Sequence, residues 1–210
     1  MTFDRLAPFY PAMESIAAGG KLQRCRLAFL DEIPAPRRVL LAGEGHGRFL
    51  TECTRRFPEA EIVVVDASAR MLEIAMRKPG ASRVEFIHSD LLEWQPQEGD
   101  FDLIVTHFFL DCFPADSLAT IVARLAGLAA GDAHWLLADF QIAPTRMAGL
   151  RCRVIVALLY RFFRITCGLH ADALVSPDAD LIKSGFLRHR RITTELDLLK
   201  SEWWRRTSES

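Results

Sequence analysis

Apolar and polar positions alternate in blocks along the chain, so that strands and helices are predicted in turn. The run 61–67 is β-branched and apolar throughout its centre, which is typical of a strand covered on both faces of a parallel sheet. The predicted strands are 38–42, 61–67, 83–90, 101–109 and 134–140. The segments 49–57 and 68–78 place their apolar residues on one helical face. This alternation predicts a doubly wound α/β fold with helices on both faces.

A longer amphipathic helix is predicted after the fourth strand, over 116–131, with Gly131 as its end. The last part of the chain contains two further segments that can form strands, 185–195 and 195–204, and the latter ends in two tryptophans expected to pack. A length of 210 residues favours one domain with a small appendage. We therefore expect an N-terminal helical lid over 1–35 and a single ligand-binding unit over 36–210.

Composition narrows the class of protein. Apolar residues make up 50% and charged residues 25% of the chain, as in ordinary globular proteins. Lys and Arg number 26 against 27 Asp and Glu, a net charge of -1 that offers no basic field for nucleic acid. The five cysteines lack metal-ligand spacing, and the N-terminus lacks the pattern of a signal peptide. Reduced thiols, no metal and a cytoplasmic location are expected.

The stretch LAGEGHGRFL, residues 41–50, places three glycines at alternate positions directly after the first strand. Such a turn lets a ligand approach the backbone closely at the edge where α/β sheets bind ligands. A dinucleotide fingerprint requires a glycine at position 48, which is Arg48, and the Gly-Lys-Ser/Thr ending of a phosphate loop is absent. The motif is GxGxG, from Gly43 to Gly47.

Two acidic residues stand at the ends of the next two strands. Asp66 follows Gly43 by 23 residues and can accept hydrogen bonds from both ribose hydroxyls of a nucleoside. Nicotinamide cofactors use an acid in the same way, so Asp66 alone does not identify the ligand. Asp90, at the end of the third strand, distinguishes between these ligands.

At this point the chain resembles the class I S-adenosylmethionine-dependent methyltransferases of small-molecule type, over roughly residues 36–140. The family motif VLxxGxGxG matches 39–47, and acids after the second and third strands match Asp66 and Asp90. The resemblance implies S-adenosyl-L-methionine as cofactor. It also implies a seven-stranded, mostly parallel sheet in the order 3-2-1-4-5-7-6, with the last strand antiparallel.

The resemblance also implies which positions border the cofactor. These are Gly43, Glu44, Gly45, Gly47, Asp66, Ala67, Ser68, Met71, Ser89, Asp90, Leu91, Thr106 and His107. Many members carry an acid two positions before the first glycine, where this chain has Leu41. Glu44, within the turn, is the candidate to replace its contact with the amino group of the cofactor. Ser68 is also predicted to cap the helix that it precedes.

A catalytic base is needed only where the acceptor must lose a proton. His107, at the end of the fourth strand, is the best-placed candidate, with Asp111 four residues later. A histidine in an apolar strand also serves structural roles, so both interpretations of His107 stay open. The strand ends in THFF rather than in the Pro-Pro-aromatic motif of relatives that methylate nucleic-acid amines. Methyl transfer to an oxygen, carbon or nitrogen atom of a small, rather apolar acceptor is therefore expected.

The acceptor pocket is expected to include Phe108 and the N-terminal residues Phe9 and Tyr10. The stretch FDRLAPFY resembles the FDxxAxxY of methyltransferases acting on quinones, sterols and related lipophilic molecules; the alternative is ordinary helix packing. The segment 149–169 predicts an apolar helix with its arginines on one side. This helix is either a core helix with a solvated basic face or one that rests on an anionic membrane. Those arginines are Arg151, Arg153, Arg161 and Arg164.

Two other functions remain compatible with the sequence. One is binding of the cofactor without methyl transfer, as in a cyclase-like enzyme or a regulatory subunit. The other is an NAD(P)-dependent reductase, against which Arg48 argues because it replaces the third glycine of the dinucleotide motif. The sequence implies no oligomeric state.

Overall fold

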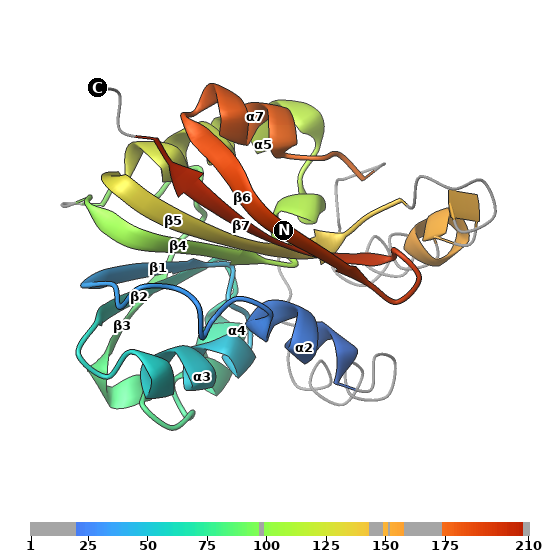
Figure 1. Cartoon of the computed structure of the whole chain (residues 1–210). Coiled ribbons are helices and arrows are strands. Elements are labelled where there is room, and N and C mark those ends of the chain that lie inside the picture. The colour runs from blue at the N-terminus through green and yellow to red at the C-terminus, as the bar shows by residue number, and fades with distance from the viewer. Residues whose placement is uncertain (1–19, 97–98, 143–148, 151, 158–173, 208–210) are drawn as a thin grey trace.

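A seven-stranded sheet forms the centre of the protein in the computed structural model, which describes residues 20–96, 99–142, 149–150, 152–157 and 174–207. The strands run in the order β3-β2-β1-β4-β5-β7-β6 (Figure 1). The strands are β1 (Arg38–Ala42), β2 (Glu61–Asp66), β3 (Val84–His88), β4 (Phe101–His107), β5 (Ala129–Phe140), β6 (Phe186–Thr194) and β7 (Leu199–Arg206). The α-helices are α2 (Lys21–Leu27), α3 (Arg48–Arg56), α4 (Ala69–Ala75), α5 (Ala115–Gly127) and α7 (Asp178–Lys183), and the 3-10 turns are η1 (Ala81–Arg83) and η2 (Leu110–Cys112).

Six strands run in one direction, and β7 runs against both of its neighbours. β1 pairs in parallel with β2 and with β4, so that Val39 lies opposite Ile62 on one side and Leu103 on the other. β7 pairs antiparallel with β5 and with β6. The predicted strand order and the antiparallel last strand are confirmed.

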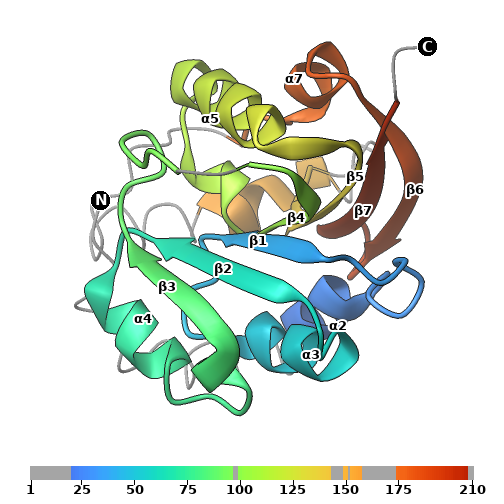
Figure 2. The ribbon, with the colours of Figure 1, turned by 90° about the vertical axis from the view of Figure 1, so that its left-hand side faces the viewer.

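Helices cover both faces of the sheet, as the doubly wound pattern predicts. α5 and α7 lie on one face and α2, α3 and α4 on the other (Figures 1 and 2). Neighbouring side chains of one strand point to opposite faces. Trp135 and Trp204 therefore pack under α5 and α7, whereas Leu136 and Trp203 pack on the α3 side. All four are buried, and the two C-terminal tryptophans are packing residues of the last strand, as expected.

The helix after β4 ends earlier than the sequence predicts. α5 stops at Gly127 with Leu128 as its C-cap, and Gly131 lies exposed within β5. The predicted helix end at Gly131 is wrong. The reason is pairing across the sheet, because Phe101 of β4 donates its backbone N–H to Leu128 O at 3.0 Å and lies opposite Ala129. Ala129 and Ala130, which would also suit a helix, therefore belong to β5.

The start of α4 agrees with the sequence prediction. Ser68 caps α4 by accepting the backbone N–H of Met71 at 3.2 Å, as predicted. Cys25, Cys53 and Cys152 are buried, and no disulfide joins the cysteines of the described part of the chain.

Two predicted segments are described only in part. Of the N-terminal lid, α2 is described and begins directly after Gly20, whereas Phe9 and Tyr10 lie outside the described residues. Of the predicted helix 149–169, residues 149–150 and 152–157 are helical, with Arg153 exposed. The arginines outside the described residues are Arg151, Arg161 and Arg164. Within the described ranges, no helix has the length and apolar character needed to cross a membrane.

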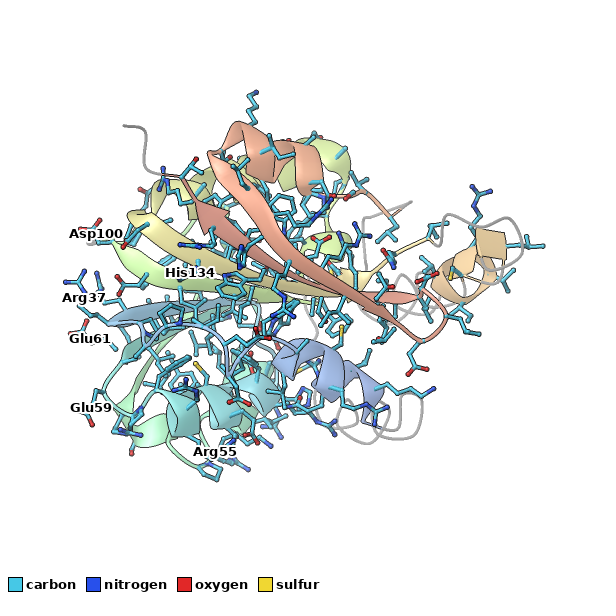
Figure 3. All side chains as sticks on the ribbon, in the orientation of Figure 1. Arg37, Arg55, Glu59, Glu61, Asp100 and His134 are labelled. Carbon is cyan, nitrogen blue, oxygen red and sulfur yellow. The ribbon has the colours of Figure 1, made fainter. Side chains whose placement is uncertain are left out.

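Charged side chains gather at the amino ends of the parallel strands. Figure 3 shows Arg37, Glu61 and Asp100 at this edge. Asp102, in β4, accepts the backbone N–H groups of Arg37 and Arg38 at 2.8 and 2.9 Å, which ties the start of β1 to β4. Open α/β sheets bind ligands at the carboxyl ends of their strands, so a ligand site is expected at the opposite edge of the sheet.

Candidate active site

The main pocket lies at the carboxyl ends of β1, β2, β3 and β4. It is partly open to solvent and lies where α/β sheets bind ligands. Twelve of the residues proposed from sequence line it together. They are Gly43, Glu44, Gly45, Asp66, Ala67, Ser68, Met71, Ser89, Asp90, Leu91, His107 and Phe108.

The glycine turn forms one wall of this pocket. Gly43 and Gly45 both have φ of +67°, in the left-handed region that favours glycine. A Cβ at Gly43 would stand 2.0 Å from the ring of Phe109, whereas a Cβ at Gly45 would meet nothing within 4 Å. Gly43 therefore allows an aromatic ring to lie against the backbone, and Gly45 leaves room beside the turn for a ligand.

Glu44 caps the helix that follows the turn. Its Oε1 accepts the backbone N–H groups of Phe49 and Leu50, each at 2.9 Å, at the start of α3. The preceding N-cap position, Gly47, has no side chain to do so. Burial raises the pKa of the Glu44 carboxyl to about 7, against the lowering effect of these hydrogen bonds and of Arg26. Glu44 lines the pocket, but one of its oxygens is occupied by the helix.

Asp66 joins two loops of the pocket. Its Oδ2 accepts the backbone N–H of Gly45 at 2.9 Å, and its Oδ1 accepts that of Ser68 at 2.8 Å. An ionised carboxylate is an acceptor only, so this side chain can bind hydroxyl and N–H groups but cannot donate to a ligand. The carboxylate is thereby oriented before any ligand arrives.

Asp90 lies at the end of β3, beside Asp66. Ser89 donates its backbone N–H to Asp66 O at 3.2 Å, which brings the two strand ends together. The Oδ1 of Asp90 accepts the backbone N–H of Leu92 at 2.9 Å, and Asp90 is otherwise exposed. Leu91 is buried and supplies an apolar surface next to this carboxylate.

His107 ends β4 as a neutral imidazole. Burial lowers its pKa well below the ordinary value, and the nearby charge of Arg26 adds to this. Its ring contacts the edge of Phe49, with centroids 4.6 Å apart. Nδ1 is buried without a hydrogen-bond partner among the described residues. His107 can therefore offer a neutral nitrogen in the pocket, whereas its protonated form is disfavoured.

Phe108 adopts a strained backbone conformation in the pocket wall. Its φ is +54°, in the left-handed region, and its N–H donates to Ala138 O at 2.7 Å. The ring lies 5.0 Å from the guanidinium of Arg26 and 5.4 Å from the ring of Phe140. Strain of this kind persists only where the surroundings hold it, and it is concentrated at functional sites.

Arg26 is one of the pocket residues that sequence reasoning missed. It lies in α2, is only 8% exposed, and lines the pocket together with the glycine turn. No motif marks it, and the only available signal was an arginine within the apolar pattern of the predicted lid. The other pocket residues not predicted are His46, Val65, Phe109, Cys112 and Phe113.

Three predicted residues do not line the pocket. Thr106 is fully buried, and its Oγ1 accepts the indole N–H of Trp135 at 2.8 Å. Gly47 starts α3 and packs against Ala75 of α4. Asp111 is buried beside Asp139, behind the pocket wall. Phe9 and Tyr10, which were predicted to line the acceptor pocket, lie outside the described residues.

Comparison with known proteins agrees with this geometry. Residues 39–131 match the family model of a methyltransferase domain. A demethylmenaquinone methyltransferase from Deinococcus radiodurans is 33% identical over 110 residues, which are 50% of this chain and 46% of that protein. The chain spans less than half the length of the first curated relatives that it matches.

Solved structures share the fold at low identity. An O-methyltransferase family protein from Burkholderia thailandensis has a TM-score of 0.74 at 15% identity, over 97% of this chain and 60% of that one. The 1,6-didemethyltoxoflavin-N1-methyltransferase of the same organism, solved with S-adenosylhomocysteine, has a TM-score of 0.67 at 16% identity, over 96% and 85%.

The strand order, the pocket and the match to a methyltransferase domain agree with one another, and they make the chain similar to the S-adenosylmethionine-dependent methyltransferases. One of the solved structures that share its fold contains S-adenosylhomocysteine, the demethylated form of S-adenosylmethionine. The residues present fit that cofactor. The carboxylate of Asp66 lies in the pocket wall, Leu91 offers an apolar surface, and the space beside Gly45 is open.

Proposed function

We propose that the protein transfers the methyl group of S-adenosylmethionine to a small acceptor that carries a hydroxyl group on an apolar, aromatic body. One observation carries the proposal: Asp66 and Asp90, at the ends of adjacent strands, share one pocket with the glycine turn and with three phenylalanines. The acids and the turn suit the cofactor, and the phenylalanines suit the acceptor. They are Phe108, Phe109 and Phe113.

Asp66 is proposed to bind the ribose hydroxyls of the cofactor. The two backbone N–H groups that it already accepts fix its orientation, and charge-assisted hydrogen bonds to hydroxyls are among the stronger ones. Asp90 and Leu91 are proposed to hold the adenine, the former by its carboxylate and the latter by its apolar side chain. Ala67, Ser68 and Met71 line the same part of the pocket.

Arg26 is proposed to bind the carboxylate of the methionine half. It is a buried cation in the same pocket as Gly43 and Gly45, the turn proposed to face that half. A guanidinium matches a carboxylate with two parallel hydrogen bonds. Glu44 stands nearby, with a pKa raised to about 7 by burial, so its charge is partly suppressed at neutral pH.

The acceptor is proposed to lie against the aromatic side of the pocket. The rings of Phe109 and Phe113 pack edge to face with centroids 5.0 Å apart, and Cys112 lies between them in sequence. Such a wall suits a flat apolar molecule. The relative from Deinococcus radiodurans is named for demethylmenaquinone, a molecule of this kind. Residues 1–35 are proposed to act as the lid of this side, and the cytoplasm as the location.

The cofactor, when bound, supplies an activated methyl group on a positively charged sulfur. The protein then has to bind both molecules, align them and exclude water. The glycine turn and Asp66 provide the alignment from one side, and the phenylalanines exclude water from the other. The neutral imidazole of His107 adds no positive charge that would repel a sulfonium.

The test is binding followed by turnover. Calorimetry should detect binding of S-adenosylmethionine, and the protein should then release S-adenosylhomocysteine in the presence of naphthohydroquinone, an aromatic acceptor with hydroxyl groups. Binding without release, over a panel of phenols and hydroquinones, would instead support a protein that binds the cofactor without transferring methyl. Binding of NADH in place of S-adenosylmethionine would contradict the proposal.

A further inference from the structure

Two aspartates stand together directly behind the aromatic wall of the pocket. Asp111 lies in η2, between the pocket residues Phe109 and Cys112, and Asp139 lies near the end of β5. Their exposed fractions are 6% and 2%, and their side chains are joined by a hydrogen bond. Two carboxyl groups can share such a bond only if one of them carries a proton.

The described surroundings offer too little positive charge to keep both carboxylates ionised. Lys200 lies opposite Asp139 in β7 and is buried, but its Nζ is 3.4 Å from Glu202 and 3.4 Å from Asp178. Its charge is therefore shared with two other acids. Burial raises the pKa of both aspartates, and for Asp139 the charge of Asp111 raises it further. The thiols of Cys112 and Cys25 are further titratable groups near the pair.

The pair also has a free acceptor position. Oδ1 of Asp139 is buried without a hydrogen-bond partner among the described residues, although a buried carboxylate oxygen normally has one. The pocket wall is close to both aspartates. Cys112, which lines the pocket, donates its thiol to Asp111 Oδ1 at 3.6 Å. Phe108, which also lines the pocket, donates its backbone N–H to the carbonyl of Ala138, the residue before Asp139.

We propose that Asp111 and Asp139 form a carboxyl pair that shares one proton and accepts a second proton from the acceptor during methyl transfer. This inference rests on the proposed function. The acceptor hydroxyl gives its proton to the pair through the thiol of Cys112, which lines the pocket, takes up this proton on sulfur and passes its own to Asp111. The acceptor oxygen forms the bond to the methyl carbon. The electron pair of the broken carbon–sulfur bond stays on sulfur. The proton leaves the pair for solvent after product release.

His107 is the competing base, and the site disfavours it. Accepting a proton would create an imidazolium in a buried position close to the cation of Arg26. The pair, by contrast, carries one negative charge and becomes neutral when it takes up a proton. In a low-dielectric site the loss of charge is favoured over its creation.

Infrared spectroscopy tests the shared proton without any acceptor or cofactor. At neutral pH the protein should show carbonyl stretches of buried, protonated carboxylic acids, to which Glu44 contributes because its pKa is raised to about 7. The band of the pair is the one that Glu44→Gln keeps and that Asp139→Asn and Asp111→Asn each lose, because in these two variants the remaining carboxylate accepts a hydrogen bond from the new amide. Asp116→Asn, an exposed position at the start of α5, should keep it. Absence of the band from the unaltered protein would overturn the proposal.

Turnover tests the role of the pair in the reaction. The double variant D111N/D139N keeps the shape of the pair but removes both carboxylates. It should bind S-adenosylmethionine as the unaltered protein does, which also reports correct folding. Its kcat with naphthohydroquinone should fall by about 100-fold or more at pH 7, as when a general base is lost. The rate should recover as pH rises and the acceptor ionises by itself.

Two outcomes would overturn the role in catalysis. One is a kcat of the double variant equal to that of D116N, with the same pH profile. The other is cofactor binding by the unaltered protein without turnover of naphthohydroquinone or of any hydroquinone in the panel. This second result contradicts the proposed function as well, and the role of the pair as proton acceptor falls with it. The infrared band is read separately, so the two failures are distinguishable.

Discussion

Asp66 Oδ2 accepts the backbone N–H of Gly45 at 2.9 Å, so the acid that ends β2 is bonded to the turn that follows β1. The same carboxylate accepts the N–H of Ser68, the residue that caps α4. One side chain therefore fixes the position of two loops of the pocket. This relationship gives Asp66 two separable effects, one on stability and one on binding.

Asp66→Ala should weaken binding of S-adenosylmethionine by about 1–3 kcal/mol, because hydrogen bonds from the ribose to a charged group are lost. Calorimetry measures the change. The matched control is Asp102→Ala, since Asp102 also accepts two backbone N–H groups but at the opposite edge of the sheet. Both variants should lose stability to urea, and only the first should lose affinity. Equal affinities would remove Asp66 from the cofactor site.

Glu44→Gln should remove a pH dependence of stability. The pKa of Glu44 is raised from its ordinary value of 4.5 to about 7 by burial, so the folded state holds the proton more tightly than the unfolded chain. The contribution of this group to stability is therefore full below pH 4.5 and is lost as pH rises through 7. The loss amounts to about 3 kcal/mol.

The measurement is urea unfolding of both proteins between about pH 4.5 and pH 8, the range that spans the two pKa values of Glu44. The amide oxygen of the substituted side chain can still accept the two backbone N–H groups at the start of α3. The variant should therefore show a flatter stability profile over this range than the unaltered protein. Parallel profiles would mean that Glu44 is ionised throughout.

Arg26→Gln should weaken binding of S-adenosylhomocysteine by about tenfold or more and leave binding of adenosine unchanged. The reason is that only the former carries the carboxylate that Arg26 is proposed to bind, and hydrogen bonds to charged groups contribute about 1.5–3 kcal/mol each. Arg24→Gln, an exposed arginine of the same helix, is the control. Calorimetry with both ligands reports the difference. A parallel loss for adenosine would indicate a distorted pocket instead.

Thr106→Val should lower the free energy of unfolding by about 1–3 kcal/mol without changing cofactor affinity. The substitution leaves the buried indole N–H of Trp135 without its acceptor. Thr106→Ser keeps the hydroxyl and should retain most of the stability. Urea unfolding and calorimetry measure the two quantities. A loss of affinity in Thr106→Val at unchanged stability would return Thr106 to the cofactor site.

The strands could be predicted because their apolar runs are short and are bounded by turn residues or by segments with a helical pattern. The end of α5 could not, since the alanines of 129–130 suit a helix and a strand equally, and pairing with Phe101 decides between them. The pattern of residues within 116–131 carries no information about this pairing with another strand. The same limit applies to Thr106, whose partner Trp135 lies on the neighbouring strand.

The candidate site divides in the same way. The glycine turn, Asp66 and Asp90 stand at strand ends in the sequence, and parallel strands bring their carboxyl ends to one edge, so their meeting follows from the order of elements. Arg26 reaches the pocket because α2 packs on the α3 face, and Asp139 meets Asp111 because β5 lies beside β4. No sequence motif or residue spacing predicts either of these two contacts.

The sequence by itself determined the class of fold, the edge of the sheet where the pocket lies and most of the residues that line this pocket, because each depends on a periodicity or on a motif within one stretch of chain. Only the tertiary structure decided what Glu44 binds, which charges surround His107 and that two aspartates meet behind the pocket. Those properties depend on burial and on distances between side chains far apart in sequence. Burial sets the energetic cost of a charge, and it is a property of the folded molecule alone.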